Sequence, residues 1–281
     1  MRNRSHRGWR RVINGVNLGA AIVFLFIAIP LYWMIASAFK TPANVGVSPP
    51  QTYPHPVSIQ NFTAAFKQYT FGQYILNSVI VAVAATVLVL VLGTLAGYAM
   101  GRLPMRGKFT MMVMLLMISV FPPIAVVVPL YALLRDMNWL NSYQALIIPY
   151  TAFYLPFAIW ILRNYFLGIP REMEESARID GASPIRTIWS IILPQTWPGL
   201  FTAGIFTFTA CWTEFLMALS FNVVNNKRTI PVGVALFGSQ FVNPYGTIFA
   251  ASVVAVVPIG VLVFIFRRRV VSGLSAGAVK G

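Results

Sequence analysis

The sequence predicts an all-α polytopic membrane protein with six transmembrane helices, and three observations carry that prediction. The 281 residues are 58% hydrophobic and only 10% charged, with a mean hydropathy of +0.73, which is too apolar for an ordinary soluble domain. Six stretches approach the roughly 20 apolar residues that a membrane-spanning helix needs. Polar or Pro/Gly-rich connections separate them, without a soluble insertion, so residues 1–281 are expected to form one integral domain. The expected spans are residues 16–39, 74–101, 109–134, 145–162, 199–221 and 248–266.

The first span follows an arginine-rich N-terminus. Its apolar run is long for the core of a signal peptide and lacks a small-x-small cleavage site, so we expect a retained helix. The next connection is Pro-rich and then amphipathic in "IQNFTAAFKQY". That pattern predicts a short interfacial helix with Phe62, Phe66 and Tyr69 facing inward, although a plain surface spacer remains open.

The second span carries Gly93, Gly97 and Gly101 at four-residue spacing. Such a smooth stripe lets two helix backbones approach closely. The partner is either another helix of this chain or a second subunit. Several other spans contain proline, which is tolerated in a span when neighbouring groups satisfy the freed carbonyls.

The basic residues predict the orientation in the membrane. If the connections alternate between inside and outside, sixteen of the 21 lysines and arginines fall on the side of the termini. The positive-inside rule then places both termini in the cytoplasm. The basic residues that give the net charge of +15 are therefore interpreted as topology anchors, and no nucleic-acid partner is expected.

The longest inside connection, residues 163–198, gathers four of the six acidic residues: Glu172, Glu174, Glu175 and Asp180. Pro170 and Gly181 bracket a predicted short helix from Arg171 to Asp180, with Gly181 in a left-handed cap. Ser183 is expected to cap a second, apolar-faced helix that Pro194 ends. A charged segment built as helix, turn and helix indicates a docking element for another protein, and the alternative is a solvated loop.

The segment "EESARIDGASPIRTIWSIILP" resembles the EAA motif of permease subunits of binding-protein-dependent ABC importers. In that motif E-A-A precedes a glycine by three residues, and I-x-L-P follows the glycine after nine. Glu175, Ser176 and Ala177 match its start, with Ser176 for the usual alanine, and Leu193 and Pro194 match its end. The segments "ILNSVIVA", "CWTEFLMALSF" and "VVSGLSAGAVKG" extend the resemblance to maltose-permease G-type subunits of the carbohydrate-uptake branch.

The resemblance implies that the short helix is a coupling helix, which docks on a cytoplasmic ATPase subunit. It implies ATPase-coupling roles for ten residues: Glu172, Glu174, Glu175, Ser176, Ala177, Arg178, Asp180, Gly181, Leu193 and Pro194. The C-terminal tail resembles one that reaches between the ATPase subunits, through Ser275, Gly277, Val279, Lys280 and Gly281, unless it is a plain flexible end.

The implied assembly contains this chain, a second and different permease subunit, two ATPase subunits and an extracytoplasmic solute-binding protein, in the inner membrane of a bacterium or archaeon. This chain is expected to hold no cofactor, because it has no G-x-x-x-x-G-K-[ST] loop, and the partner subunits would bind ATP and Mg²⁺. Its single cysteine and two histidines also predict no metal site, and no enzyme activity is expected.

Glu214 is the only acidic residue in any expected span, so it is a candidate for the translocation path together with Trp212 and Thr213. A purely structural hydrogen-bonding role remains the alternative. Members of the similar branch usually have asparagine where Thr213 stands. The expected cargo is a neutral di- or oligosaccharide. The open alternatives are glycerol-phosphate or a sugar alcohol as cargo, and a stand-alone secondary transporter.

Overall fold

The computed structural model describes residues 15–238 and 243–278, and within these ranges the chain is helical without strands. The predicted all-α class is therefore confirmed. The chain divides into two compact units. The first comprises Met1–Thr70 and Val234–Val256, and the second comprises Phe71–Gly233 and Val257–Gly281.

The first unit contains α2 (Gly15–Ala38), the one-turn helix η1 (Pro42–Asn44), α3 (Gln60–Gln68) and the start of α14 (Tyr245–Ala278). The predicted short helix is confirmed as α3, and the orientation of its aromatic residues toward the membrane interface stays a prediction. Asn61 and Ala65 are buried, whereas Phe66 is 47% exposed. The Asn61 amide donates to the carbonyls of Ala38 and Lys40, at 3.1 and 2.7 Å, and these carbonyls need partners beyond the end of α2.

Lys40 lies just beyond α2 and is buried in the same unit. Burial lowers the pKa of its ammonium group, because the charged form is desolvated. Its Nζ donates to the Gln51 carbonyl at 2.6 Å and lies 4.1 Å from the centre of the Trp33 ring. These two contacts compensate the ammonium group and anchor the Pro-rich connection to the end of α2.

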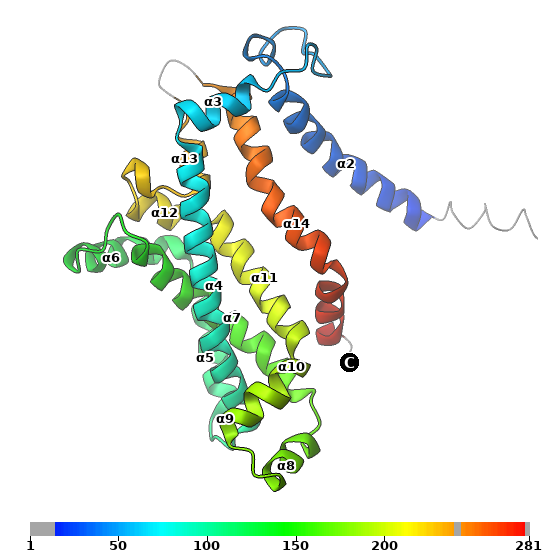
Figure 1. Ribbon diagram of the computed structural model, residues 1–281, viewed down its shortest axis with the longest axis vertical. Helices are drawn as coiled ribbons and strands as arrows, with labels where there is room; N and C mark the ends of the chain where they lie inside the picture. The colour runs from blue at the N-terminus through cyan, green and yellow to red at the C-terminus, as the bar shows by residue number, and fades with distance from the viewer. Residues whose placement is uncertain (1–14, 239–242, 279–281) are drawn as a thin grey trace, which may run out of the picture. The chain divides into compact units, whose positions relative to one another are not determined.

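The core of the second unit is the packing of α4 (Phe71–Arg102) against α7 (Gln144–Leu167), with α11 (Trp197–Thr213) beside both (Figure 1). The glycine stripe of α4 lies in this contact. A Cβ atom at Gly97 would lie 3.2 Å from the Leu162 Cβ and from the Arg163 amide nitrogen. The stripe therefore serves packing within this chain, the first of its two predicted roles.

We expect Gly97→Leu to lower the free energy of unfolding by about 1–3 kcal/mol, because the added atoms would force α4 and α7 apart. Gly260→Leu is the matched control, since a Cβ there meets no atom within 4 Å. Thermal unfolding in detergent checks the prediction. Equal melting temperatures for the two variants would contradict it.

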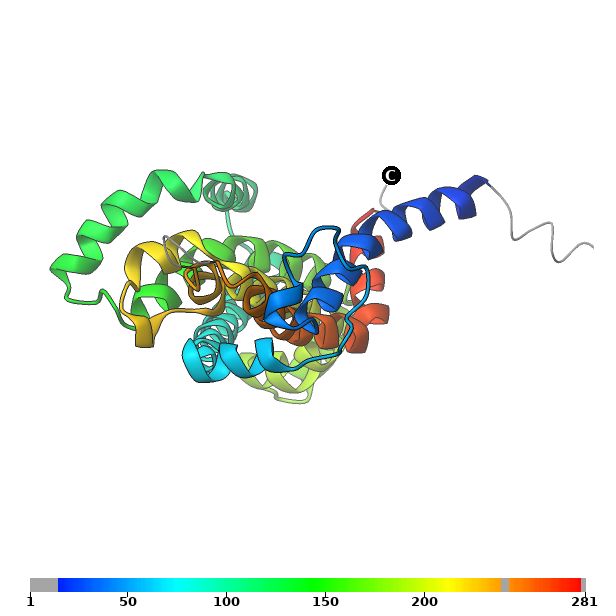
Figure 2. The same cartoon turned by 90° about the horizontal axis from the view of Figure 1, so that it is seen from above.

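The expected third span is not one straight helix. It consists of α5 (Lys108–Val120) and α6 (Pro123–Asp136), which are bent by 88° relative to each other. In Figure 2, α5 is seen nearly end-on while α6 runs across the view. Phe121 and Pro122 both precede a proline and are extended, with ψ of 132° and 121°. The residue before a proline disfavours the helical conformation, which explains the break.

The expected fifth span is also interrupted. Helix α11 ends at Thr213, Glu214 is extended with φ −65° and ψ 130°, and α12 (Leu216–Phe221) follows. The one-turn η3 (Asn225–Lys227) and α13 (Ile230–Ala235) complete this part of the chain.

The six-span count is therefore only partly matched within the described residues. Four of the expected spans coincide with single helices that are long and apolar enough to cross a membrane, and the α5–α6 pair is a fifth if it is counted as one bent span. The four helices are Asn17–Ala38, Phe71–Arg102, Gln144–Leu167 and Tyr245–Phe266.

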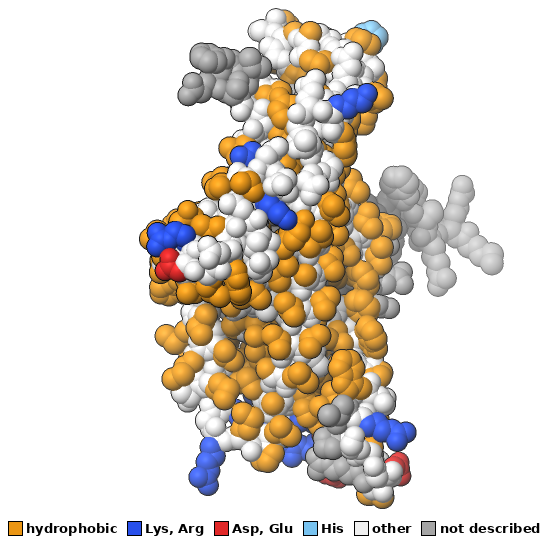
Figure 3. Space-filling view, turned by 60° about the vertical axis from the view of Figure 1, so that its left-hand side comes forward, with side chains coloured by type: hydrophobic (Ala, Val, Ile, Leu, Met, Phe, Trp, Pro, Cys, Tyr) orange, Lys and Arg blue, Asp and Glu red, His pale blue; other side chains and the backbone are white. Residues whose placement is uncertain are grey.

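The surface of these helices is apolar. Hydrophobic side chains cover most of the face seen in Figure 3, and charged side chains are few and scattered. Phe109 and Val120 on α5 are each 82% exposed. Such surface is unfavourable in water, and it fits an integral membrane protein whose helices face lipid or other subunits.

Candidate functional site

Residues 163–198, which include the last turn of α7 and the first residues of α11, are built around a helix, a turn and a second helix, and we call this segment the coupling loop. Its first helix is α8 (Glu172–Ile179), close to the predicted range. Gly181 has φ +77°, and the Ala182 amide donates to the Ala177 carbonyl at 2.9 Å. This six-to-one bond across a left-handed residue is a Schellman cap. The predicted left-handed cap at Gly181 is therefore confirmed.

The second helix begins as predicted and ends later than predicted. The Ser183 hydroxyl accepts from the Arg186 amide at 3.3 Å, as an N-cap does. Helix α9 (Pro184–Thr187) continues as a π-helical turn (Ile188–Ile192) and α10 (Leu193–Gln195). Pro194 therefore does not end it. The Leu193 amide bonds five residues back to Ile188, and this wider turn accommodates the proline that lacks an N–H group.

Glu174 points into the chain rather than outward with the other acids of α8. Its Oε1 lies 2.8 Å from Arg102 Nε at the end of α4, and the Tyr98 hydroxyl donates to its Oε2 at 3.3 Å. The Arg102 guanidinium also donates to the Ile169 carbonyl. Both side chains of the ion pair are at most 9% exposed. Glu174 therefore does not belong to the charged surface that the sequence predicts for docking, and it ties the coupling loop to α4.

The remaining coupling-loop candidates divide into an inner and an outer set. Ala177 is buried beside Glu174 on the inner side of α8. Leu193 is half-buried, and the side chain of Arg178 lies outside the described residues. The exposed candidates are Glu172, Glu175, Ser176, Asp180, Gly181 and Pro194. The outer face of α8 is thus acidic and is not covered by other described residues of this unit, as a docking surface requires.

The C-terminal candidates are only partly described. Ser275 and Gly277 lie in the last turns of α14. Val279, Lys280 and Gly281 lie outside the described residues. The predicted tail contact therefore stays a prediction.

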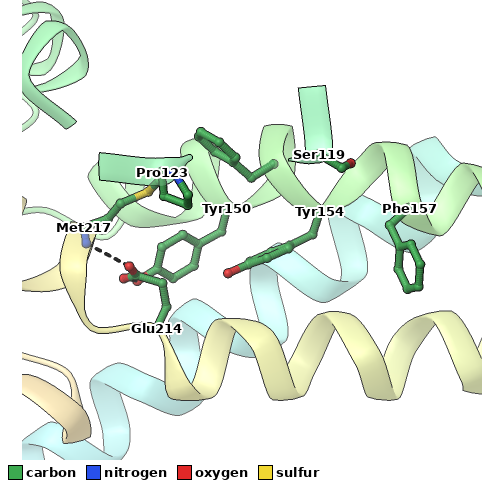
Figure 4. Close-up of a pocket in the computed structure, with 8 residues that line it drawn as sticks. Ser119, Pro123, Tyr150, Tyr154, Phe157, Glu214 and Met217 are labelled. Atoms are coloured by element: carbon green, nitrogen blue, oxygen red, sulfur yellow. Dashed lines mark hydrogen bonds between the residues drawn. The ribbon is translucent and has the colours of Figure 1, made fainter. Parts of the chain in front are cut away.

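A cavity of about 270 Å³ lies where the two helix breaks of the second unit face the middle of α7 (Figure 4), and we call it the Glu214 pocket. Ser119 and Pro123 come from the two sides of the α5–α6 break, and Glu214 and Met217 come from the α11–α12 break. The wall from α7 is aromatic, and consists of Tyr150, Phe153, Tyr154 and Phe157.

The Glu214 carboxylate is held in place by three donors. The Tyr150 hydroxyl donates to Oε2 at 2.5 Å, the Met217 amide to Oε1 at 2.8 Å, and the Ala218 amide to Oε2 at 3.1 Å. The two amides belong to the first turn of α12, so the side chain caps that helix across the break. Glu214 forms no ion pair within the described ranges.

The other two translocation-path candidates lie elsewhere. Trp212 is 3% exposed, and its ring stacks on Phe208 with centroids 5.4 Å apart. Thr213 is exposed, and its hydroxyl donates to the Thr209 carbonyl at 2.9 Å. Only Glu214 of the three lines the pocket.

Sequence reasoning missed Arg102 and Tyr98 as partners of the coupling loop, and it missed Tyr150 and Tyr154 in the pocket. Arg102 fits the positive-inside pattern of a topology anchor, and the tyrosines lie in apolar runs without a distinguishing local pattern. Among the described residues, no group of three or more His, Cys, Asp or Glu side chains is placed to hold a metal ion.

Known proteins resemble this chain over most of its length. It is 39% identical over 264 residues to the sulfoquinovosyl glycerol transport system permease protein SmoH of Agrobacterium fabrum, covering 94% of this chain and 93% of the relative. It is 37% identical to the trehalose/maltose transport system permease protein MalG of Thermococcus litoralis, covering 94% and 95%. The trehalose transport system permease protein SugB of Mycobacterium tuberculosis is 36% identical, with 92% and 95% covered.

A solved structure supports the fold. A bacterial ABC transporter involved in the import of the acidic polysaccharide alginate matches with a TM-score of 0.79, covering 95% of this chain and 98% of that chain at 19% identity. The family model for binding-protein-dependent transport system inner membrane components matches residues 90–276. The resemblance inferred from the EAA-like segment is thereby confirmed, and the chain belongs to this family of inner membrane transport components.

Proposed function

We propose that this chain is one of two different permease subunits of an ATP-driven ABC importer for sugars. The observation that carries the proposal is the coupling loop, a preformed helix and left-handed glycine turn fixed to α4 by the Arg102–Glu174 ion pair. A lone helix of eight residues is not stable in water, so α8 needs this support to present a defined surface.

The proposed mechanism is mechanical. ATP and Mg²⁺ bind to two partner ATPase subunits, whose closure pulls on the outer face of α8. Because Glu174 joins α8 to the end of α4, a displacement of α8 is transmitted to α4, and through the glycine contact to α7. Movement of the α4–α7 pair relative to the partner permease then alternates access to the path between outside and inside.

The proposed cargo is a neutral sugar, delivered by an extracytoplasmic solute-binding protein. Two relatives whose names include trehalose are 36–37% identical to this chain over nearly its whole length, which favours sugars as the cargo class. Both termini are proposed to lie in the cytoplasm, because the basic residues concentrate on that side.

Affinity purification of the tagged chain from its native membrane in mild detergent tests the proposal. We expect a second permease and an ATPase to copurify, and the reconstituted assembly to import a sugar only with ATP and the binding protein. Recovery of the chain alone, with uptake in vesicles that have no ATP, would support the stand-alone secondary transporter instead. Preferred uptake of a glycerol-phosphate would leave the assembly standing and overturn the cargo.

A further inference from the structure

The Glu214 pocket lies at interruptions of two of the expected spans, residues 109–134 and 199–221. Irregular backbone is tolerated within a span only where it is buried in protein or lines a wet cavity, because lipid offers no hydrogen bonds. The α5–α6 break at Ser119 and Pro123 and the α11–α12 break at Glu214 and Met217 open on the same cavity. Their convergence brings the polar side chains of Ser119 and Glu214 to one mostly aromatic cavity.

Glu214 lines this cavity and has unused hydrogen-bonding capacity. A carboxylate offers about four lone-pair positions, and the Tyr150 hydroxyl and the Met217 and Ala218 amides occupy three of them. The remaining position is suited to a hydroxyl donor of a ligand. The same fixed negative charge, without an ion-pair partner in the described part of the chain, repels an anionic ligand.

The opposite wall offers aromatic surface. Tyr154 and Phe157 project into the cavity from successive turns of α7 (Figure 4). Aromatic rings pack against apolar C–H surface, such as the faces of a pyranose ring, while a few polar groups fix its orientation. The volume of about 270 Å³ lies just below the range of about 300–1,000 Å³ typical of ligand sites, so it suits one ring rather than an oligosaccharide.

We propose that the Glu214 pocket is a subsite for one uncharged sugar ring, with Glu214 accepting a ring hydroxyl and Tyr154 and Phe157 stacking on the ring. This subsite deepens the proposed function and rests on it, because it assigns part of the sugar path to this subunit. It also assigns to Glu214 the exclusion of acidic sugars.

Saturation-transfer NMR on the assembled importer in nanodiscs tests this subsite, with glucose and glucuronate as probes. The two differ only in a hydroxymethyl group against a carboxylate. The wild-type importer is expected to give saturation transfer to the ring protons of glucose and at least threefold less to those of glucuronate. Tyr154→Leu is expected to reduce the glucose transfer about threefold to tenfold, as loss of an aromatic contact predicts.

Phe157→Leu is a second, milder variant, because Phe157 is already 39% exposed and its loss threatens the fold less. Phe109→Leu is the matched control, since Phe109 is 82% exposed on α5 and does not line the cavity. Glu214→Gln is expected to bring the glucuronate transfer close to that of glucose, because the amide keeps the shape and removes the charge.

Three results would overturn the subsite. They are glucose transfer that stays unchanged in both Tyr154→Leu and Phe157→Leu, equal transfer to both probes in the wild type, and glucuronate exclusion that persists in Glu214→Gln. Copurification of the ATPase and ATP-driven uptake, measured on the same preparations, separate these results from failure of the proposed function. If the assembly itself does not form, the proposed function fails and the subsite fails with it.

Discussion

Replacing Glu174 with glutamine is expected to reduce ATP-driven uptake by more than tenfold while ATP hydrolysis continues. The change leaves the Arg102 guanidinium buried without its counter-charge, and breaking such a pair costs about 3–5 kcal/mol. A coupling loop released from α4 still binds the ATPase but no longer transmits its movement. Sugar uptake and ATP hydrolysis are measured on the same proteoliposomes, and the ratio of uptake to hydrolysis is expected to fall.

The chain supplies a matched control for this prediction. Arg135 and Asp136 also form an ion pair, with N–O distance 3.0 Å, but their side chains are 64% and 66% exposed. An exposed pair contributes at most about 1 kcal/mol, so Asp136→Asn should leave uptake nearly unchanged.

A charge swap distinguishes positioning from general damage. Arg102→Glu and Glu174→Arg are each expected to abolish uptake, and the double variant is expected to restore a measurable part of it, because the pair is rebuilt in reverse. Uptake within twofold of wild type in Glu174→Gln would contradict the role of the pair, as would a double variant no better than either single one.

Gly181→Val is expected to abolish uptake while the protein still inserts and binds its partner permease. Gly181 has φ +77°, which costs a residue with a Cβ about 1–2 kcal/mol and a β-branched residue more. No atom lies within 4 Å of a Cβ built there, so the effect is conformational rather than steric. Sugar uptake and copurification of the partner permease are the two measurements.

Two further variants sharpen this test. Gly181→Asn should retain substantial uptake, because asparagine tolerates the left-handed region. Gly107→Val places the same strain in another connection, where φ is +76° and a Cβ also meets no atom within 4 Å. It should impair uptake much less. Normal uptake in Gly181→Val would rule out the left-handed turn as a requirement for coupling.

The sequence predicted the coupling loop well because its signals are local. Proline and glycine bracket α8, and the capping serine precedes Pro184, so neighbours in the chain determine these boundaries. The inward orientation of the Glu174 side chain was not predictable in the same way. It depends on Arg102, which lies on a different helix and which no local sequence pattern distinguishes from a topology anchor.

The helix breaks show the same limit. Pro122 and Pro123 lie inside the expected third span, where proline can be tolerated, and the sequence did not predict that the helix axis would turn there by 88°. The break at Glu214 has no proline or glycine beside it, and the acid itself stabilises the break by capping α12. The pocket requires both breaks and α7 together, so it is a property of the tertiary structure.

Site-directed photo-crosslinking tests most directly whether α8 contacts an ATPase subunit. The only cysteine, Cys211, is buried and is replaced by serine, and Ser176→Cys, exposed on α8, is labelled with a maleimide benzophenone. Met105→Cys, in the connection between α4 and α5, serves as the control position. Within the assembled importer, we predict an adduct between position 176 and the ATPase, and little from position 105. An assembled importer that yields no ATPase adduct from position 176 would contradict the account.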